Sequence, residues 1–255
     1  MNESPSNLTA GALGRLLHRQ HSDCLRSLLN CAAGALLLVS VFAVPCAAAD
    51  SDGLWNSLME GNRAYVAGRI TFDDLVELRH HSAAHQNPPV TILSCSDSRV
   101  PPELVFDRSI DELFVIRVAG NVAGPFDIAS IEYAIRNGYT KLIVVLGHED
   151  CGAVRAALSG KEMDSPSLDA LVGRIRESFG GIGPWSLEPP TVRRAVEANA
   201  RASAAFLVAH SRIIREAVQS GSVGLVVAYY DLSTGAVERI DRSPGRSKPS
   251  GGDPH

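Results

Sequence analysis

The chain has 255 residues, of which 45% are hydrophobic and 20% are charged, ordinary values for a soluble globular protein. Its formal net charge of −4 argues against the basic surface that nucleic-acid binding requires, so we predict no nucleic-acid partner. Without the leader described next, roughly 200 residues remain, which is enough to bury one sizeable core. We therefore expect one folded domain.

The first 49 residues have the pattern of a cleavable signal peptide. Several arginines precede an uncharged stretch over residues 27–49, whose centre has the length of a secretory h-region. Pro45 breaks this stretch, and the small residues 47–49 form a cleavage site. We predict cleavage between Ala49 and Asp50, and a periplasmic or secreted mature protein with no membrane contact. An uncleaved anchor is the alternative, because the stretch is long enough to span a bilayer.

From residue 50 onward, strand and helix patterns alternate along the chain. Short apolar runs typical of buried strands lie at 90–95, 113–118, 141–147 and 223–230. Helical patterns lie between and around them, at about 54–68, 128–138, 168–179 and 191–220. Continuous apolar strands separated by helices indicate an α/β fold, with a mainly parallel central β-sheet and helices on both faces. We assign the folded domain to residues 50–240 and expect a disordered tail over 241–255.

Three residues with metal-binding side chains follow or close predicted strands. Cys95 closes the first strand, and His148 and Cys151 come just after the third. Ligands of parallel α/β sheets bind at the carboxyl ends of the strands. Two thiolates and an imidazole would fill three positions of a tetrahedral zinc ion and leave the fourth open. The alternative is a Cys95–Cys151 disulfide, because these are the two cysteines of the mature chain and the compartment is oxidising.

A carboxylate and a guanidinium accompany the first of these cysteines. Asp97 lies two residues after Cys95 and could hydrogen-bond solvent at the metal or fill the fourth metal position itself. Arg99 could hold Asp97 in a bidentate pair and keep it ionised. An ordinary loop salt bridge is the alternative for this pair taken alone. Together with the thiols and the imidazole, the pair favours a catalytic site.

Three segments carry a specific resemblance: CSDSRVPPE at 95–103, RVAGNVA at 117–123 and GHEDCGAV at 147–154. They resemble the signature segments of β-class carbonic anhydrases, and the similarity runs from about residue 54 to 240. The resemblance implies a β-carbonic anhydrase fold with zinc ligands Cys95, His148 and Cys151. It also implies the Asp97–Arg99 pair beside the metal. The assembly it implies is a homodimer or homotetramer with active sites near the subunit interface.

Further positions match the family one at a time. Gln86 matches a glutamine that hydrogen-bonds substrate in the plant-like, open-site subgroup. Phe114 and Tyr133 fall where that subgroup places aromatic residues of the pocket, with Tyr133 acting across the dimer. The subgroup with a non-catalytic bicarbonate site has tryptophan where this chain has Ile92. The resemblance therefore favours the plant-like subgroup over the bicarbonate-allosteric one.

The function that the resemblance implies is the zinc-dependent, reversible hydration of carbon dioxide to bicarbonate and a proton. In this hypothesis zinc-bound hydroxide attacks carbon dioxide while Asp97 accepts a hydrogen bond from it. Gln86 and the backbone N–H of Gly152 would hydrogen-bond the bicarbonate that forms. Two alternatives stay open. One is hydrolysis of carbon disulfide or carbonyl sulfide, and the other is a non-catalytic zinc or redox protein of the same fold.

Overall fold

The computed structural model describes residues 50–71, 74–180 and 186–241. The predicted leader at 1–49 and the tail from residue 242 lie outside these ranges, so both stay predictions. Within the described ranges, none of the helices has the length and apolarity needed to cross a membrane.

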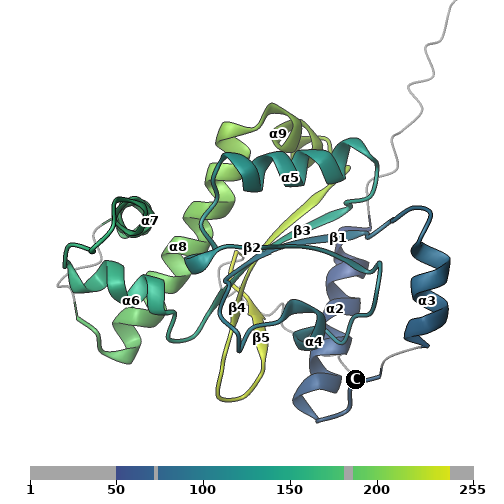
Figure 1. Ribbon diagram of the computed structural model, residues 1–255, viewed down its shortest axis with the longest axis horizontal. Coiled ribbons are helices and arrows are strands. Elements are labelled where there is room, and N and C mark those ends of the chain that lie inside the picture. The colour runs from purple at the N-terminus through teal and green to yellow at the C-terminus, as the bar shows by residue number, and fades with distance from the viewer. Residues whose placement is uncertain (1–49, 72–73, 181–185, 242–255) are drawn as a thin grey trace, which may run out of the picture. The chain divides into compact units, whose positions relative to one another are not determined.

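A five-stranded sheet forms the centre of the domain (Figure 1). Its strand order is β2-β1-β3-β4-β5, and all neighbouring pairs are parallel except β4 and β5, which are antiparallel. The strands are β1 (Val90–Ser94), β2 (Leu113–Arg117), β3 (Leu142–His148), β4 (Gly224–Tyr230) and β5 (Val237–Arg239). The predicted mainly parallel α/β sheet is confirmed, and β5 is a short addition to it.

Helices cover both faces of this sheet, as the sequence predicts (Figure 1). One face packs against α2 (Ser51–Val66) and α4 (Pro102–Val105). The other packs against α5 (Pro125–Arg136), α8 (Pro189–His210) and α9 (Arg212–Gln219). The remaining helices are α3 (Leu75–Ser82), α6 (Gly152–Ser159) and α7 (Pro166–Glu177).

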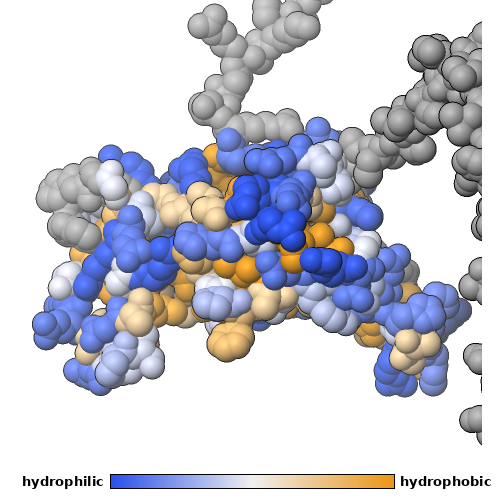
Figure 2. Space-filling model, turned by 90° about the horizontal axis from the view of Figure 1, so that it is seen from above, coloured by the Kyte–Doolittle hydropathy of each residue, from blue (hydrophilic) through white to orange (hydrophobic). Residues whose placement is uncertain are grey.

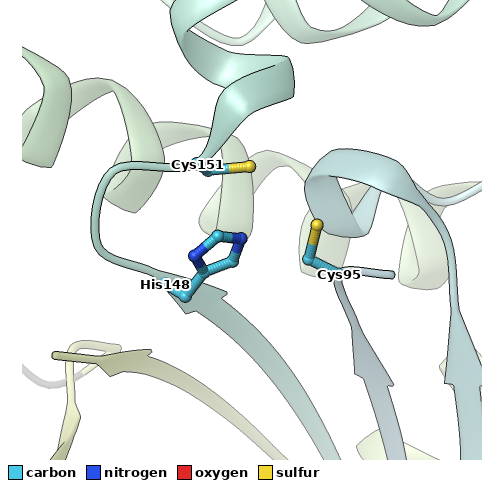
Figure 3. Close-up of side chains that lie close together, drawn as sticks. All are labelled: Cys95, His148 and Cys151. Atoms are coloured by element: carbon cyan, nitrogen blue, oxygen red, sulfur yellow. The ribbon is translucent and has the colours of Figure 1, made fainter. Parts of the chain in front are cut away.

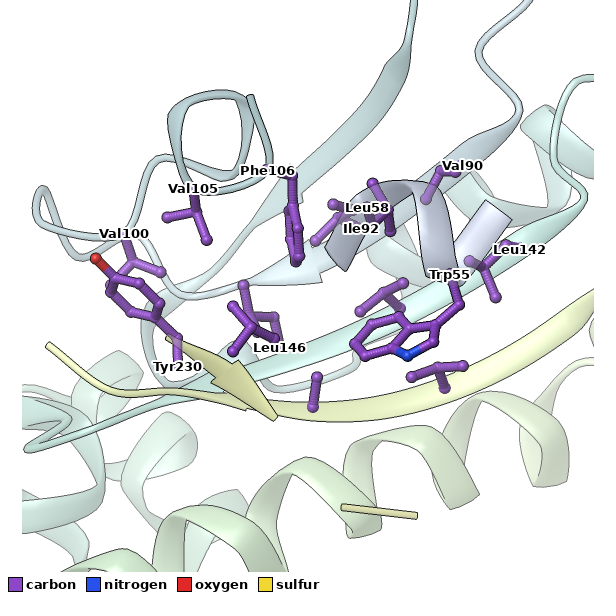
Figure 4. Packing of buried hydrophobic residues seen from close by; sticks show 14 residues of the cluster. Trp55, Leu58, Val90, Ile92, Val100, Val105, Phe106, Leu142, Leu146 and Tyr230 are labelled. Atoms are coloured by element: carbon purple, nitrogen blue, oxygen red, sulfur yellow. The ribbon is translucent and has the colours of Figure 1, made fainter. Parts of the chain in front are cut away.

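The central strand β3 shows why its sequence is apolar throughout. All seven of its residues are buried. Leu142, Val144 and Leu146 pack in the core beneath α2 and α4, whereas Ile143 and Val145 pack beneath α5, α8 and α9. Figure 4 shows the first of these cores, where Trp55 lies over the strands. Burial on both faces explains the continuous apolar run, which ends at the first polar residue of functional interest, His148.

The helical pattern predicted over 191–220 is two helices rather than one. Ser211 has extended backbone angles, with φ −122° and ψ 120°, and it separates α8 from α9. Its side chain accepts a hydrogen bond from Ile214 N and donates one to Glu132 on α5. The serine therefore caps the second helix and fixes the bend, an effect that hydrophobic periodicity does not register.

Helix α2 approaches α4 closely at Gly61. A Cβ atom at this position would overlap the main-chain carbonyl oxygen of Phe106, which is buried. We expect Gly61→Ala to lower the free energy of unfolding by about 3 kcal/mol, because backbone on both sides must shift. Urea unfolding followed by circular dichroism measures this.

The matched control is Gly173→Ala in α7, where an added Cβ meets no atom within 4 Å. Alanine is the better helix former, so this variant should match the wild type or gain up to about 1 kcal/mol. Equal unfolding free energies for the two variants would contradict the close approach of α2 and α4.

Candidate metal centre

Neighbouring strands bring the three predicted ligands to one edge of the sheet. Cys95 directly follows β1, and His148 is the last residue of β3, which pairs in parallel with β1. Cys151 is the N-cap residue of α6. The ligand atoms of the three side chains all lie within 4.8 Å of one another. Figure 3 shows the three side chains close together. The predicted cluster is therefore formed within a single chain.

The imidazole of His148 is oriented by its own main chain. Its Nδ1 lies 2.8 Å from the carbonyl oxygen of Glu149. A carbonyl can only accept, so Nδ1 carries the proton and Nε2 presents its lone pair. Within the described part of the chain, Nε2 is one of four buried side-chain atoms without a hydrogen-bond partner. An unpartnered buried acceptor that faces two thiols fits a metal ligand.

Both thiols are buried and free. The backbone N–H of Gly120 donates to Cys95 Sγ over 3.3 Å. The hydrogen bond with Cys151 lowers the pKa of Cys95 against the effect of burial. The same bond, together with burial, raises the pKa of Cys151. The donor set of two sulfurs and one nitrogen fits zinc.

The Asp97–Arg99 pair lies beside this cluster. Arg99 donates to both carboxylate oxygens, from Nε over 2.9 Å and from Nη2 over 2.8 Å. These bonds hold the pKa of Asp97 well below its usual range, so the carboxylate stays ionised at neutral pH. Asp97 Oδ2 lies 3.9 Å from His148 Nε2. The predicted bidentate pair is present, and its carboxylate faces the metal ligands.

Sequence reasoning gave no role to Arg117, the last residue of β2. Its side chain donates to the carbonyl oxygens of Cys95 and Asp97, over 3.0 and 2.5 Å. The strand register places it opposite Ser94, next to the first ligand. It fixes the loop that carries both residues. Arg117 is the first residue of the RVAGNVA segment, but only the pairing of β1 with β2 shows which groups its side chain contacts.

The predicted substrate residues fall into two groups. Gly152 follows Cys151 and begins α6, where a helix leaves its first N–H groups without intrahelical partners. Phe114 pairs with Thr91 on the neighbouring strand. Thr91 lies four residues before Cys95, so the two are about 13 Å apart along the strand. Tyr133 stacks near Phe114 with ring centroids 6.4 Å apart, and the exposed Gln86 precedes β1. In a single chain, these last three residues therefore lie toward the strand ends opposite the metal ligands.

Comparisons with known proteins agree with this site. Residues 90–237 match the family model described as carbonic anhydrase. "Carbonic anhydrase 2" of Mycobacterium tuberculosis is 37% identical over 187 residues, covering 71% of this chain and 88% of the relative. "Carbonic anhydrase" of Mycolicibacterium smegmatis is 34% identical over 191 residues, with 72% and 90% covered.

Solved structures show the same fold. A β-carbonic anhydrase of Aspergillus fumigatus superposes with a TM-score of 0.58 at 25% identity, covering 75% of this chain and 90% of that one. A tetrameric β-carbonic anhydrase of Sordaria macrospora gives a TM-score of 0.57 at 24% identity, with 74% and 98% covered.

The fold and the site together define an α/β metalloenzyme with a two-cysteine, one-histidine centre at the carboxyl edge of a parallel sheet. The chain belongs to the β-carbonic anhydrase family. Its Cys95–His148–Cys151 cluster fits the zinc-dependent hydration of carbon dioxide.

Proposed function

We propose that Cys95, His148 and Cys151 hold the zinc ion of a carbon dioxide hydratase, and that Asp97 acts on the reacting water. The observation that carries this is the unpartnered His148 Nε2 facing two free thiols, with the Asp97 carboxylate 3.9 Å away. Zinc, when bound, lowers the pKa of water so that it becomes a nucleophile near neutral pH. Stopped-flow carbon dioxide hydration by zinc-loaded protein tests the proposal.

The chain's own residues account for the orientation of the water and of the product. Asp97 is ionised and can therefore accept a hydrogen bond from the reacting water, which turns a lone pair of the water toward carbon dioxide. Arg99 keeps the carboxylate in place through its two parallel bonds. In this proposal the backbone N–H of Gly152, at the start of α6, donates to an oxygen of bicarbonate.

We also assign the chain to the plant-like, open-site subgroup. In support, both oxygens of Asp97 bond to Arg99, which leaves the fourth position around the ligands to solvent. Ile92, where the bicarbonate-allosteric subgroup has tryptophan, is fully buried in the core under α2 and α4.

We further propose a homo-oligomer, a dimer or tetramer, in which a second copy brings Gln86, Phe114 and Tyr133 to the partner's metal centre. Phe126 is 89% exposed and Tyr133 is 51% exposed, both on α5. Strand β2 at the edge of the sheet is mostly half-buried. On the face seen in Figure 2, hydrophobic side chains reach the surface between hydrophilic ones. The Sordaria relative is tetrameric.

We expect Phe126→Asp to convert the oligomer into monomers, because the charge could not be buried at an interface. Hydration should fall by at least about tenfold as substrate-positioning residues are lost, while zinc content stays unchanged. Analytical ultracentrifugation and zinc counting measure both. Leu168→Asp on α7, 47% exposed in the wild type, is the control and should change neither mass nor rate. A wild type that is monomeric and fully active would contradict the proposal.

Finally, we propose that residues 1–49 are removed during export to the periplasm or exterior. In support, α2 needs no residue before 50 for its cap, because the Asp50 side chain accepts from Gly53 N over 2.8 Å. N-terminal sequencing of protein recovered from the native source should begin at Asp50. A start at Met1 would contradict cleavage.

A further inference from the structure

The carbonyl that orients His148 belongs to Glu149, and the side chain of Glu149 is itself anchored. Its Oε2 accepts hydrogen bonds from the N–H groups of Leu232 and Ser233, over 3.0 and 3.3 Å. The Ser233 hydroxyl lies 3.1 Å from the same oxygen. Glu149 N donates to Tyr230 O over 2.8 Å. The residue after the histidine ligand is thus tied to β4 and to the turn that follows it.

The turn between β4 and β5, residues 231–236, is also held by hydrogen bonds that do not involve Glu149. Asp231 Oδ1 accepts bonds from the backbone N–H and the hydroxyl of Thr234, both over 2.8 Å. On its other side, the buried Asn62 of α2 donates to Gly235 O over 2.8 Å and accepts from Val237 N over 3.0 Å. The Glu149 carboxylate is therefore bonded to a turn that other hydrogen bonds hold in place.

We infer that Glu149 is a positioning residue of the metal centre. By tying the His148–Glu149 peptide to the β4–β5 turn, its carboxylate holds the carbonyl that orients the imidazole of His148. Groups that orient a metal-binding histidine commonly contribute 10–100-fold to metal affinity. The carbonyl itself survives substitution of the side chain, so the effect of losing the anchor falls near the lower end of this range. The inference rests on the zinc site proposed above.

The test compares the rate at which zinc-loaded protein loses zinc to the chromogenic chelator 4-(2-pyridylazo)resorcinol. Glu149→Ala should release zinc about tenfold faster than the wild type. Glu149→Gln should stay within about twofold, because the amide oxygen still accepts the two backbone N–H bonds. The absorption bands of the cobalt-substituted protein should shift in Glu149→Ala and not in Glu149→Gln.

Two controls separate positioning from general loss of stability. Glu60→Ala removes an exposed carboxylate from α2 and should leave zinc release unchanged. Ile214→Ala makes a cavity under α9 and should lower the melting temperature without faster zinc release. The inference is overturned if Glu149→Ala releases zinc at the wild-type rate, or if Ile214→Ala speeds release equally. A wild type that binds no zinc would overturn the zinc site itself.

Discussion

Replacement of Cys151 by alanine should abolish both zinc binding and carbon dioxide hydration. The variant loses one of three ligands whose donor atoms lie within 4.8 Å of one another. Orienting groups alone are worth 10–100-fold, so loss of a ligand should weaken zinc binding by more than about 100-fold. Hydration should then fall to the background of the buffer. Zinc counting after dialysis and stopped-flow hydration measure the two effects on one sample.

The control for this variant is Val154→Ala, three residues further on at the start of the same helix. It removes buried methyl groups from the core around α6 and α7 but no ligand. It should lower stability and keep its zinc. Full zinc content in Cys151→Ala would show that the cysteine is not a ligand.

Replacement of Asp97 by asparagine should reduce hydration by on the order of 100-fold while zinc remains bound. The amide has nearly the shape of the carboxylate, but it carries no charge, so its oxygen accepts a weaker hydrogen bond from the reacting water than a carboxylate oxygen does. Arg99 also loses its charged partner. The expected signature is a fall in kcat with stoichiometric zinc.

Asp150→Asn makes the same chemical change in the loop between His148 and Cys151. Asp150 has a left-handed backbone, with φ 50°, which asparagine also tolerates, and its side chain pairs with Arg155 rather than with the cluster. This control should keep most of the activity. Similar losses in the Asp97 and Asp150 variants would argue that charge near the site matters and not the specific placement of Asp97.

Much of the fold follows from local patterns. Strands β1, β3 and β4 are apolar runs in the centre of the sheet. Their successive side chains point to opposite faces, and both faces are covered by helices, so both must be apolar. Elements without such a pattern could not be predicted. Helix α3 has no buried residue, so it shows no apolar stripe. Strand β5 has three residues, too few to show a period.

Some residues of the candidate site could also be predicted from the sequence, and others could not. Cys95, His148 and Cys151 could be predicted because parallel strands end at a common edge and the resemblance supplied their roles. The contacts of Arg117 and Glu149 could not, since they depend on which strand and which turn lie next to the ligands. Gln86, Phe114 and Tyr133 are placed by family resemblance, and one chain does not bring them to the metal ligands.

The proposed function is tested most directly by stopped-flow carbon dioxide hydration with purified protein starting at Asp50, with zinc counted on the same sample. A zinc-dependent carbon dioxide hydratase should hold about one zinc per chain and hydrate carbon dioxide far above the buffer background. Stoichiometric zinc without hydration, across mildly acidic to mildly alkaline pH, would contradict it and direct attention to carbon disulfide or carbonyl sulfide. Absence of zinc, with Cys95 and Cys151 joined in a disulfide, would contradict the metal centre altogether.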